Sequence, residues 1–306
     1  MNVSIVIPTK NRAATLARCL KRLVPQLTRT DEVIVVDNDS TDDTKQIVDG
    51  FGKRYRILYR VETRRGASHC RNTGARIASR EGIAFIDDDS MVSPRWLAVV
   101  RSTLSRRKTS VPDAVYQGAI RQRYETDGLA ERVRLSQFHR ETTALGMRPT
   151  PPFPKLTALI VANIFTYRAT LSRFPEPFLA DVFPFIGEDQ ELACRLIRHH
   201  IPLFYVHTAA VTHEKKNAPL GTLLRQAYLY GRTKALLERM YLHDPTFINN
   251  YGLLSSRSIE SATLPALYRG VTPAEKAGIF LFHAAMAAAK SGGYHIHTFT
   301  RVPQPV

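Results

Sequence analysis

Short runs of apolar, mainly β-branched residues alternate with amphipathic stretches over the first third of the chain, and this alternation constrains the fold most. Each run is nearly continuous in its hydrophobicity, which is typical of strands covered by helices on both faces. Strands separated by helical stretches form a mostly parallel sheet through crossover connections. Four such strands are predicted, over Val3 to Ile7, Val33 to Asp37, Arg56 to Arg60 and Ile83 to Asp87.

Helical spacing fills the connections and dominates the end of the chain. Leucines at positions 16, 20, 23 and 27 form one apolar stripe between the first two strands. The pattern predicts an α/β domain over residues 1–215 and a helical extension over residues 216–306. The later predicted elements are a strand over Leu156 to Phe165, a helix over Asp189 to His200, a strand over Leu203 to His207, a helix over Thr222 to Tyr241 and a last helix after Thr272.

The composition is that of a globular protein with a basic surface. The 306 residues are 44% hydrophobic and 23% charged, which supplies a core and excludes a disordered chain. With 43 basic and 27 acidic residues, the formal net charge is +16, which favours phosphate-bearing partners such as nucleotides, nucleic acid or anionic membranes. The three cysteines form no CxxC pair, which argues against a disulfide framework or a thiolate metal site.

The sequence predicts neither a secretory signal nor a membrane-spanning segment. Met1 leads directly into the first apolar run, without a preceding basic segment. The longest apolar run, Ala277 to Ala289, is interrupted by His283 and is shorter than the roughly 20 residues that span a bilayer. We expect a cytoplasmic protein whose basic patches allow peripheral contact with anionic lipid at the inner face of the membrane.

Carboxylates gather directly after two of the predicted strands. The second strand leads into residues 37–43, which contain four aspartates, and the fourth leads into Asp87, Asp88 and Asp89. Ligands of open α/β sheets bind at these carboxyl ends. Adjacent ionised carboxylates repel one another unless a hard cation or a set of hydrogen-bond donors neutralises them. A divalent-cation site is one interpretation, and a solvated turn with a helix cap is the other.

Common motifs for calcium and nucleotide binding do not match these segments. An EF-hand loop starting at Asp37 would need glycine where Asp42 stands and glutamate where Val48 stands. The segment that follows the first strand, Pro8 to Arg12, contains no glycine. Dinucleotide-binding and P-loop folds require glycines there, so both are disfavoured.

Five short segments form an ordered set along the chain. They are Ile5 to Arg12, Glu32 to Asp42, Arg71 to Gly74, Phe85 to Asp89 and, about 100 residues further on, the acidic motif Gly187 to Leu192. Together they resemble the signatures of family 2 glycosyltransferases, and the resemblance covers roughly residues 1 to 215. It implies a GT-A fold, a nucleoside-diphosphate-sugar donor, a hydroxyl acceptor and, usually, inversion at the anomeric carbon.

The resemblance implies a site for Mn²⁺ or Mg²⁺. A cation held by carboxylates can neutralise the charge of a departing nucleoside diphosphate. By resemblance, Asp89 ligates the metal, Asp87 contacts the ribose or reaches the metal through water, and Asp88 lies nearer the sugar. His213 stands where many relatives carry a histidine that completes the metal shell, and His207 is its competitor.

Further residues are assigned by the same resemblance to the nucleotide sugar. The loop after the first strand would line the nucleotide, an aspartate would accept a hydrogen bond from the base edge, and two arginines would contact phosphate or base. The loop residues are Pro8, Thr9 and Asn11, the aspartate is Asp37, and the arginines are Arg12 and Arg71.

The acidic motif supplies the candidate general base. An acceptor hydroxyl is a poor nucleophile, so a carboxylate must take its proton during attack. Asp189 is the candidate and Glu188 the alternative. Because Asp189 begins a predicted helix, we expect the helix dipole to lower its pKa and weaken it as a base.

Two other classes of function compete with a glycosyltransferase. The net charge and the arginine-rich stretches Arg101 to Lys108 and Arg121 to Arg134 would suit a nucleic-acid-binding protein, but acids crowd the ligand end of the sheet, so no nucleic-acid partner is expected. A nucleotidyltransferase would need a glycine-rich basic loop after the first strand, and the sequence has no such loop there, so this class is disfavoured.

The sequence leaves open whether the acceptor is a glycan, a lipid-linked sugar or a natural product, and which oligomer forms.

Overall fold

The described part of the chain forms two compact units. The computed structural model describes residues 1–126, 156, 158–215, 217–241, 281, 284, 285 and 287–293. The first unit contains residues 1–123 and the described residues between 145 and 215, and the second contains residues 124–126 with the described residues after 216. The proline-rich segment 149–154 lies outside the described residues.

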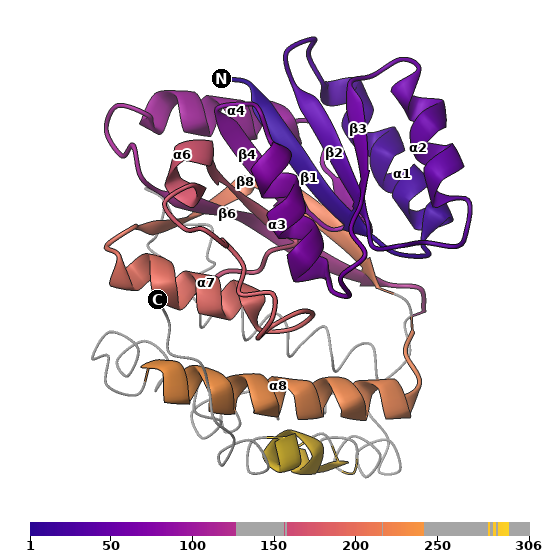
Figure 1. Ribbon diagram of the computed structural model, residues 1–306, viewed down its shortest axis with the longest axis vertical. Helices are drawn as coiled ribbons and strands as arrows, with labels where there is room; N and C mark the ends of the chain where they lie inside the picture. The colour runs from indigo at the N-terminus through magenta and orange to yellow at the C-terminus, as the bar shows by residue number, and fades with distance from the viewer. Residues whose placement is uncertain are drawn as a thin grey trace, which may run out of the picture. The chain divides into compact units, whose positions relative to one another are not determined.

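An eight-stranded sheet forms the centre of the first unit (Figure 1). Its strand order is β3-β2-β1-β4-β7-β6-β8-β5. The predicted parallel block is confirmed, because β1 pairs parallel with both β2 and β4, and β2 pairs parallel with β3. Beyond β4, the pairs β4–β7, β6–β7 and β5–β8 are antiparallel. The strands are β1 (Val3–Thr9), β2 (Glu32–Asp37), β3 (Ile57–Val61), β4 (Gly82–Ile86), β5 (Ser90–Val92), β6 (Val115–Tyr124), β7 (Asn163–Tyr167) and β8 (Leu203–Lys215).

Helices cover both faces of this sheet, as the unbroken apolar strands predict. Val3, Ile5 and Ile7 of β1 pack in the same core as α1 and α4, whereas Val6 packs on the opposite face with α3 and α7. A Cβ added to Gly74 of α3 would lie 2.3 Å from Val6, so only glycine allows this helix to approach β1 so closely. The helices of this unit are α1 (Ala13–Leu23), η1 (Val24–Gln26), α2 (Thr44–Gly52), α3 (Ala67–Ile77), α4 (Trp96–Arg107), α6 (Arg168–Leu171) and α7 (Glu188–Arg198).

Three predicted strands differ from those observed. The strand predicted to end at His207 continues to Lys215 as β8 and so carries His213. β3 is an edge strand of the sheet and is only half-buried, so the prediction that it is covered on both faces was wrong. The predicted strand from Leu156 begins only at Asn163. The apolar residues before it are buried as a loop, and Gln117 accepts a hydrogen bond from the backbone N–H of Ile160 in place of a ladder partner.

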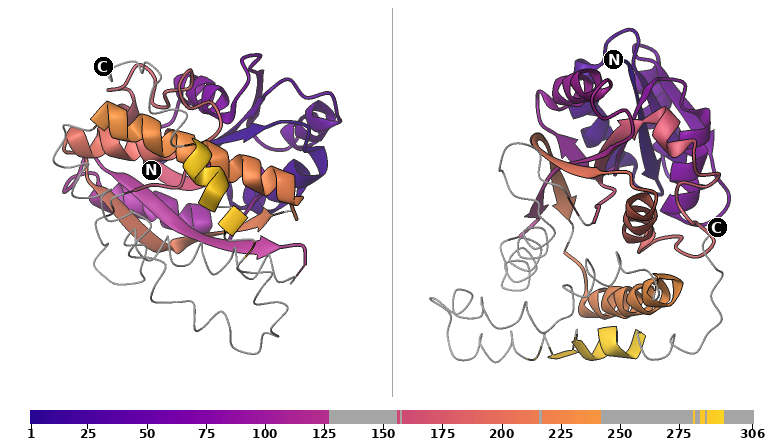
Figure 2. Two further views of the ribbon diagram at one scale, coloured as in Figure 1. Left: turned by 90° about the horizontal axis from the view of Figure 1, so that it is seen from below. Right: turned by 90° about the vertical axis from the view of Figure 1, so that its left-hand side faces the viewer.

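The described residues of the second unit include one long helix, α8 (Leu220–Tyr241), which is continuous in each view of Figure 2. Leu223, Ala227 and Leu237 lie on its buried side, whereas Tyr230 is exposed. Residues 281, 284, 285 and 287–293 are also helical, in the region of the predicted last helix. Within the described residues, no helix is long and apolar enough to cross a membrane.

Candidate active site

The acidic turn after β4 faces the end of β8. The backbone N–H of Ser90 donates to the carbonyl of Asp87 at 3.0 Å, which closes the turn through Asp88 and Asp89. The next strand, β5, pairs antiparallel with β8 in a register that sets Ser90 opposite His213. The end of β8 therefore brings an imidazole to the predicted metal-binding carboxylates.

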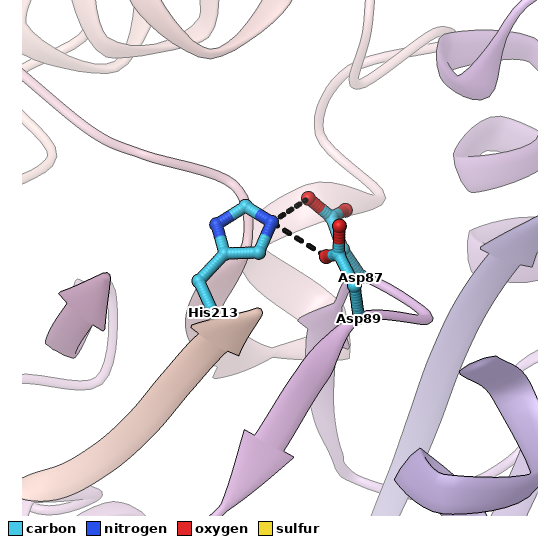
Figure 3. Close-up of side chains that lie close together, drawn as sticks. All are labelled: Asp87, Asp89 and His213. Atoms are coloured by element: carbon cyan, nitrogen blue, oxygen red, sulfur yellow. Dashed lines mark ion pairs between the residues drawn. The ribbon is translucent and has the colours of Figure 1, made fainter. Parts of the chain in front are cut away.

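Three side chains converge at this point (Figure 3). Nε2 of His213 is 2.5 Å from Oδ1 of Asp89 and 3.8 Å from Oδ2 of Asp87. The other oxygen of each aspartate is held by an arginine, since Arg12 pairs with Oδ2 of Asp89 at 2.8 Å and Arg71 with Oδ1 of Asp87 at 2.7 Å. Each aspartate thus directs one oxygen at an arginine and the other at the imidazole.

This arrangement fits a divalent cation. The ligand atoms of Asp87, Asp89 and His213 lie within 4.8 Å of one another. Oδ1 of Asp89 is buried, and the nearby ring is not aligned to donate a hydrogen bond to it. Burial acts to raise the pKa of Asp89, but close contact with His213 and the charges of Lys215 and Arg12 outweigh it and hold that pKa below its usual range. Carboxylate oxygens and one imidazole nitrogen suit Mn²⁺ or Mg²⁺.

The partners of Asp88 are Thr9 and Arg12. Asp88 accepts a hydrogen bond from Thr9 at 2.8 Å and pairs with Arg12 at 2.8 Å. Burial raises the pKa of Asp88 to about 7, and the neighbouring aspartates Asp89 and Asp87 act in the same direction. The side chain joins the acidic turn to the end of β1, and a contact with the sugar stays a prediction.

The loop after β1 is tied to the loop after β2. Asn11 has a positive φ of 50°, and its side-chain oxygen accepts from the N–H of Thr41 at 2.7 Å. Its own N–H donates to Ser40 at 2.8 Å. Pro8 and Thr9 are buried at the end of β1, whereas Asn11 is exposed and Arg12 half-exposed. The predicted nucleotide loop is therefore a fixed turn at the carboxyl end of the sheet.

Asp37 has partners within the chain. Its Oδ1 accepts from the N–H of Ser40 at 3.0 Å and from the hydroxyl at 2.5 Å, and its Oδ2 accepts from the hydroxyl of Tyr59 at 2.5 Å. A carboxylate has about four lone-pair positions. These contacts fill three of them, which leaves one for the predicted hydrogen bond from a base edge.

Arg71 links the acidic turn to α7. Its guanidinium, which is 4% exposed, binds Asp87 at 2.7 Å and Glu188 at 2.8 Å. It also lies over the ring of Phe178, 5.9 Å from the centroid. The sequence predicted that Arg71 contacts a phosphate or a base, and it did not predict this bridge between two acids. Because the guanidinium already binds both carboxylates, little of it is open to a ligand.

The two acids of the downstream motif begin α7. Gly187 precedes the helix with a φ of 98°, a conformation that glycine tolerates and other residues rarely adopt. Burial raises the pKa of Asp189 to about 7, and the charge of Glu188 adds to this effect. The backbone N–H of Gln190 donates to Asp189 at 2.8 Å and acts to lower the pKa. The prediction that the helix start lowers this pKa was wrong, because desolvation outweighs the helix.

The two candidate histidines on β8 have different surroundings. His207 is exposed, and His213 is buried beside the aspartates. Lys215 lies two residues further along the strand, and its Nζ is 2.8 Å from Nε2 of His213. Lys215 was not among the residues predicted for the site. Its spacing of two residues from His213 was the available signal, because alternate residues of a strand share a face.

The sequence and structure comparisons agree with this architecture. Residues 4–155 match the family model described as glycosyl transferase family 2. The chain therefore carries a domain of glycosyl transferase family 2. A validoxylamine A glucosyltransferase of Streptomyces hygroscopicus subsp. jinggangensis is 38% identical over 120 residues, which are 38% of this chain and 28% of that protein. The match thus spans less than a third of that relative's length.

Solved structures share the fold at low sequence identity. A mannosyltransferase from Pyrobaculum calidifontis, in complex with GDP-Man and Mn²⁺, superposes with a TM-score of 0.61 at 18% identity, covering 97% of this chain and 85% of that one. S. aureus TarS 1-349, in complex with UDP, gives a TM-score of 0.56 at 17% identity, with coverages of 97% and 90%. These likenesses show a shared GT-A-type fold.

Proposed function

We propose that this protein is a metal-dependent glycosyltransferase that moves a sugar from a nucleoside-diphosphate sugar to a hydroxyl acceptor with inversion at the anomeric carbon. The observation that carries the proposal is the convergence of Asp87, Asp89 and His213. Arg71 links this group to the acidic residues at the start of α7. The family of the domain supports the reaction class. The Mn²⁺, GDP-Man and UDP named for proteins of the same fold support the metal and the donor class.

Asp87, Asp89 and His213 would hold Mn²⁺ or Mg²⁺. When bound, such an ion supplies Lewis-acid stabilisation of the negative charge that develops on the leaving nucleoside diphosphate. The protein's own contribution is to fix the ligands, because Arg12 and Arg71 hold the outer oxygens of the two aspartates in place.

The carboxyl ends of β1 and β2 are the proposed binding region for the nucleotide. Pro8 and Thr9 end β1, Asn11 lies in the turn that follows, and Asp37 retains one lone-pair position for a base donor. The side chain of Arg12 is 37% exposed and stands beside the acidic turn, so it can reach a phosphate.

Asp189 is the proposed general base. A base is most effective when its pKa lies near the working pH, and burial brings the pKa of Asp189 to about 7. Glu188 is less suited, because Arg71 occupies one of its oxygens. In an inverting reaction, Asp189 would take the acceptor proton as the hydroxyl attacks the anomeric carbon from the face opposite the diphosphate.

The acceptor is proposed as a glycan, a lipid-linked sugar or a natural product. The relative named for validoxylamine A supports the last of these classes. We propose that residues 1–215 form the catalytic domain, that residues 216–306 form a helical extension, and that basic patches provide peripheral contact with anionic lipid at the inner face of the membrane.

Substitution of one metal ligand tests the proposal. Asp89→Ala should abolish Mn²⁺-dependent release of nucleoside diphosphate from UDP- or GDP-sugars, because the site loses a ligand with a low pKa. Asp113→Ala is the matched control, since Asp113 is a surface aspartate paired with Arg173 at 2.7 Å. Near wild-type activity of Asp89→Ala, with the control also active, would refute the metal assignment.

A further inference from the structure

The ammonium of Lys215 contacts the atom that a metal would bind. Its Nζ is 2.8 Å from Nε2 of His213. The same nitrogen is 2.5 Å from Asp89 and 3.8 Å from Asp87. Lys215 therefore brings a positive charge to the point where the carboxylates and the imidazole converge.

The strand geometry holds Lys215 in this place. Alternate residues of a strand share a face, so His213 and Lys215 lie on one face of β8 and Glu214 on the other. The N–H of Glu214 donates to the carbonyl of Asp89 at 2.9 Å. Its carboxylate pairs with Arg18 at 3.3 Å and with Arg123. Glu214 thus fixes the strand end while leaving the ammonium of Lys215 on the side of the imidazole.

A metal and Lys215 compete for one lone pair. An ammonium group has donors only, so at 2.8 Å from Nε2 it uses the imidazole nitrogen as an acceptor. A metal ion requires the same lone pair of the neutral ring. The contact between Lys215 and His213 and a bond between a metal and His213 exclude one another.

The charges around the site favour a cationic side chain on its inner side. Arg12 and Arg71 neutralise the outer oxygens of Asp89 and Asp87, which leaves two inner oxygens near the imidazole. Lys215 supplies positive charge on this inner side. The lysine is half-buried, and its four-carbon stem with three rotatable donors can move without disturbing β8.

We propose that Lys215 is the internal counter-ion of the metal site, which a divalent cation displaces and which then binds the diphosphate of the nucleotide. The inference rests on the proposed function, because it takes the cation and the nucleoside diphosphate as ligands. It separates two states of Lys215: bound to His213 in the metal-free protein, and bound to phosphate oxygens in the complex.

Opposite changes in two affinities test this exchange. Lys215→Met should bind Mn²⁺ alone about fivefold more tightly than the wild type in isothermal titration calorimetry, because the competing ammonium is gone. At saturating Mn²⁺, it should bind the tighter of UDP and GDP about tenfold more weakly. Lys215→Arg should retain most of the nucleotide affinity. Lys108→Met is the matched control, since Lys108 is a surface lysine paired with Glu81, and both affinities should stay unchanged.

Each outcome separates this inference from the proposed function. If the wild-type protein binds Mn²⁺ and a folded Lys215→Met variant binds it no more tightly, the counter-ion role of Lys215 is overturned but the metal site is not. Unchanged nucleotide affinity in Lys215→Met overturns the phosphate contact. Wild-type protein that binds no Mn²⁺, even with nucleotide present, overturns the metal site of the proposed function and the role of Lys215 with it.

Discussion

Replacing Arg71 by methionine would remove the link between the acidic turn and α7. The guanidinium is 4% exposed and pairs with Asp87 at 2.7 Å and Glu188 at 2.8 Å. Breaking a buried ion pair from one side costs about 3–5 kcal/mol, because the remaining charge stays buried without a partner. Glu188 would carry most of this cost, since its side chain is 6% exposed, whereas that of Asp87 is 24% exposed and can be hydrated.

Urea unfolding measures this cost directly. Arg71→Met should lower the free energy of unfolding by about 3–5 kcal/mol at pH 8. At pH 5 the loss should be smaller, because burial already raises the pKa of Glu188, and without Arg71 this carboxyl takes up a proton more readily. A loss below about 1 kcal/mol at pH 8 would refute the reasoning, since it would mean that the two acids do not depend on Arg71.

Arg195 provides a matched control for a purely structural effect. It is another buried arginine paired with a glutamate of α7, at 2.7 Å from Glu191, and it lies over the ring of Phe174. Arg195→Met should cost similar stability while leaving the Mn²⁺ affinity of the folded protein unchanged. Arg71→Met should weaken Mn²⁺ binding about tenfold, because Asp87 loses the partner that orients it. Equal Mn²⁺ affinities in the two variants would show that Arg71 only stabilises the fold.

Three further predictions concern the titration of Asp189, the pH dependence of stability and the close approach of Gly66 to Pro184. Below about pH 7, log(kcat/KM) should rise by one per pH unit as Asp189 loses its proton. The variant Asp189→Asn should have no turnover but should retain its affinity for the donor. A flat pH profile from pH 5 to 8 would exclude Asp189 as the base. Because the folded state keeps the protons of Asp88 and Asp189 up to about pH 7, well above the ordinary aspartate pKa of 3.8, stability should fall as pH rises through this range, and less so in Asp189→Asn. Gly66→Ala should cost about 1–3 kcal/mol, because Gly66 has a φ of 136° and a Cβ there would lie 2.5 Å from the carbonyl of Pro184. Gly50→Ala, which meets no atom within 4 Å, should leave stability unchanged or slightly higher, and equal effects of the two glycine variants would contradict the proposed contact.

Local sequence determined the framework that carries the site. Nearly continuous apolar runs define β1, β2 and β4, and buried parallel strands need such runs whatever surrounds them. Because the carboxyl ends of parallel strands meet at one edge, the aspartates after β2 and β4 were predictable as neighbours of the first loop. The resemblance of the sequence to family 2 glycosyltransferases also identified His213 as a candidate metal ligand.

Tertiary structure alone decided how these groups are paired. Arg71 and Glu188 are 117 residues apart, and only the packing of α3 and α7 on one face of the sheet brings them together. Asp88 and Asp89 are adjacent in sequence, but burial raises the pKa of Asp88, whereas His213, Lys215 and Arg12 hold the pKa of Asp89 below its usual range. Desolvation and charge pairing depend on every neighbour in space, whereas a sequence pattern reports only neighbours along one strand or helix.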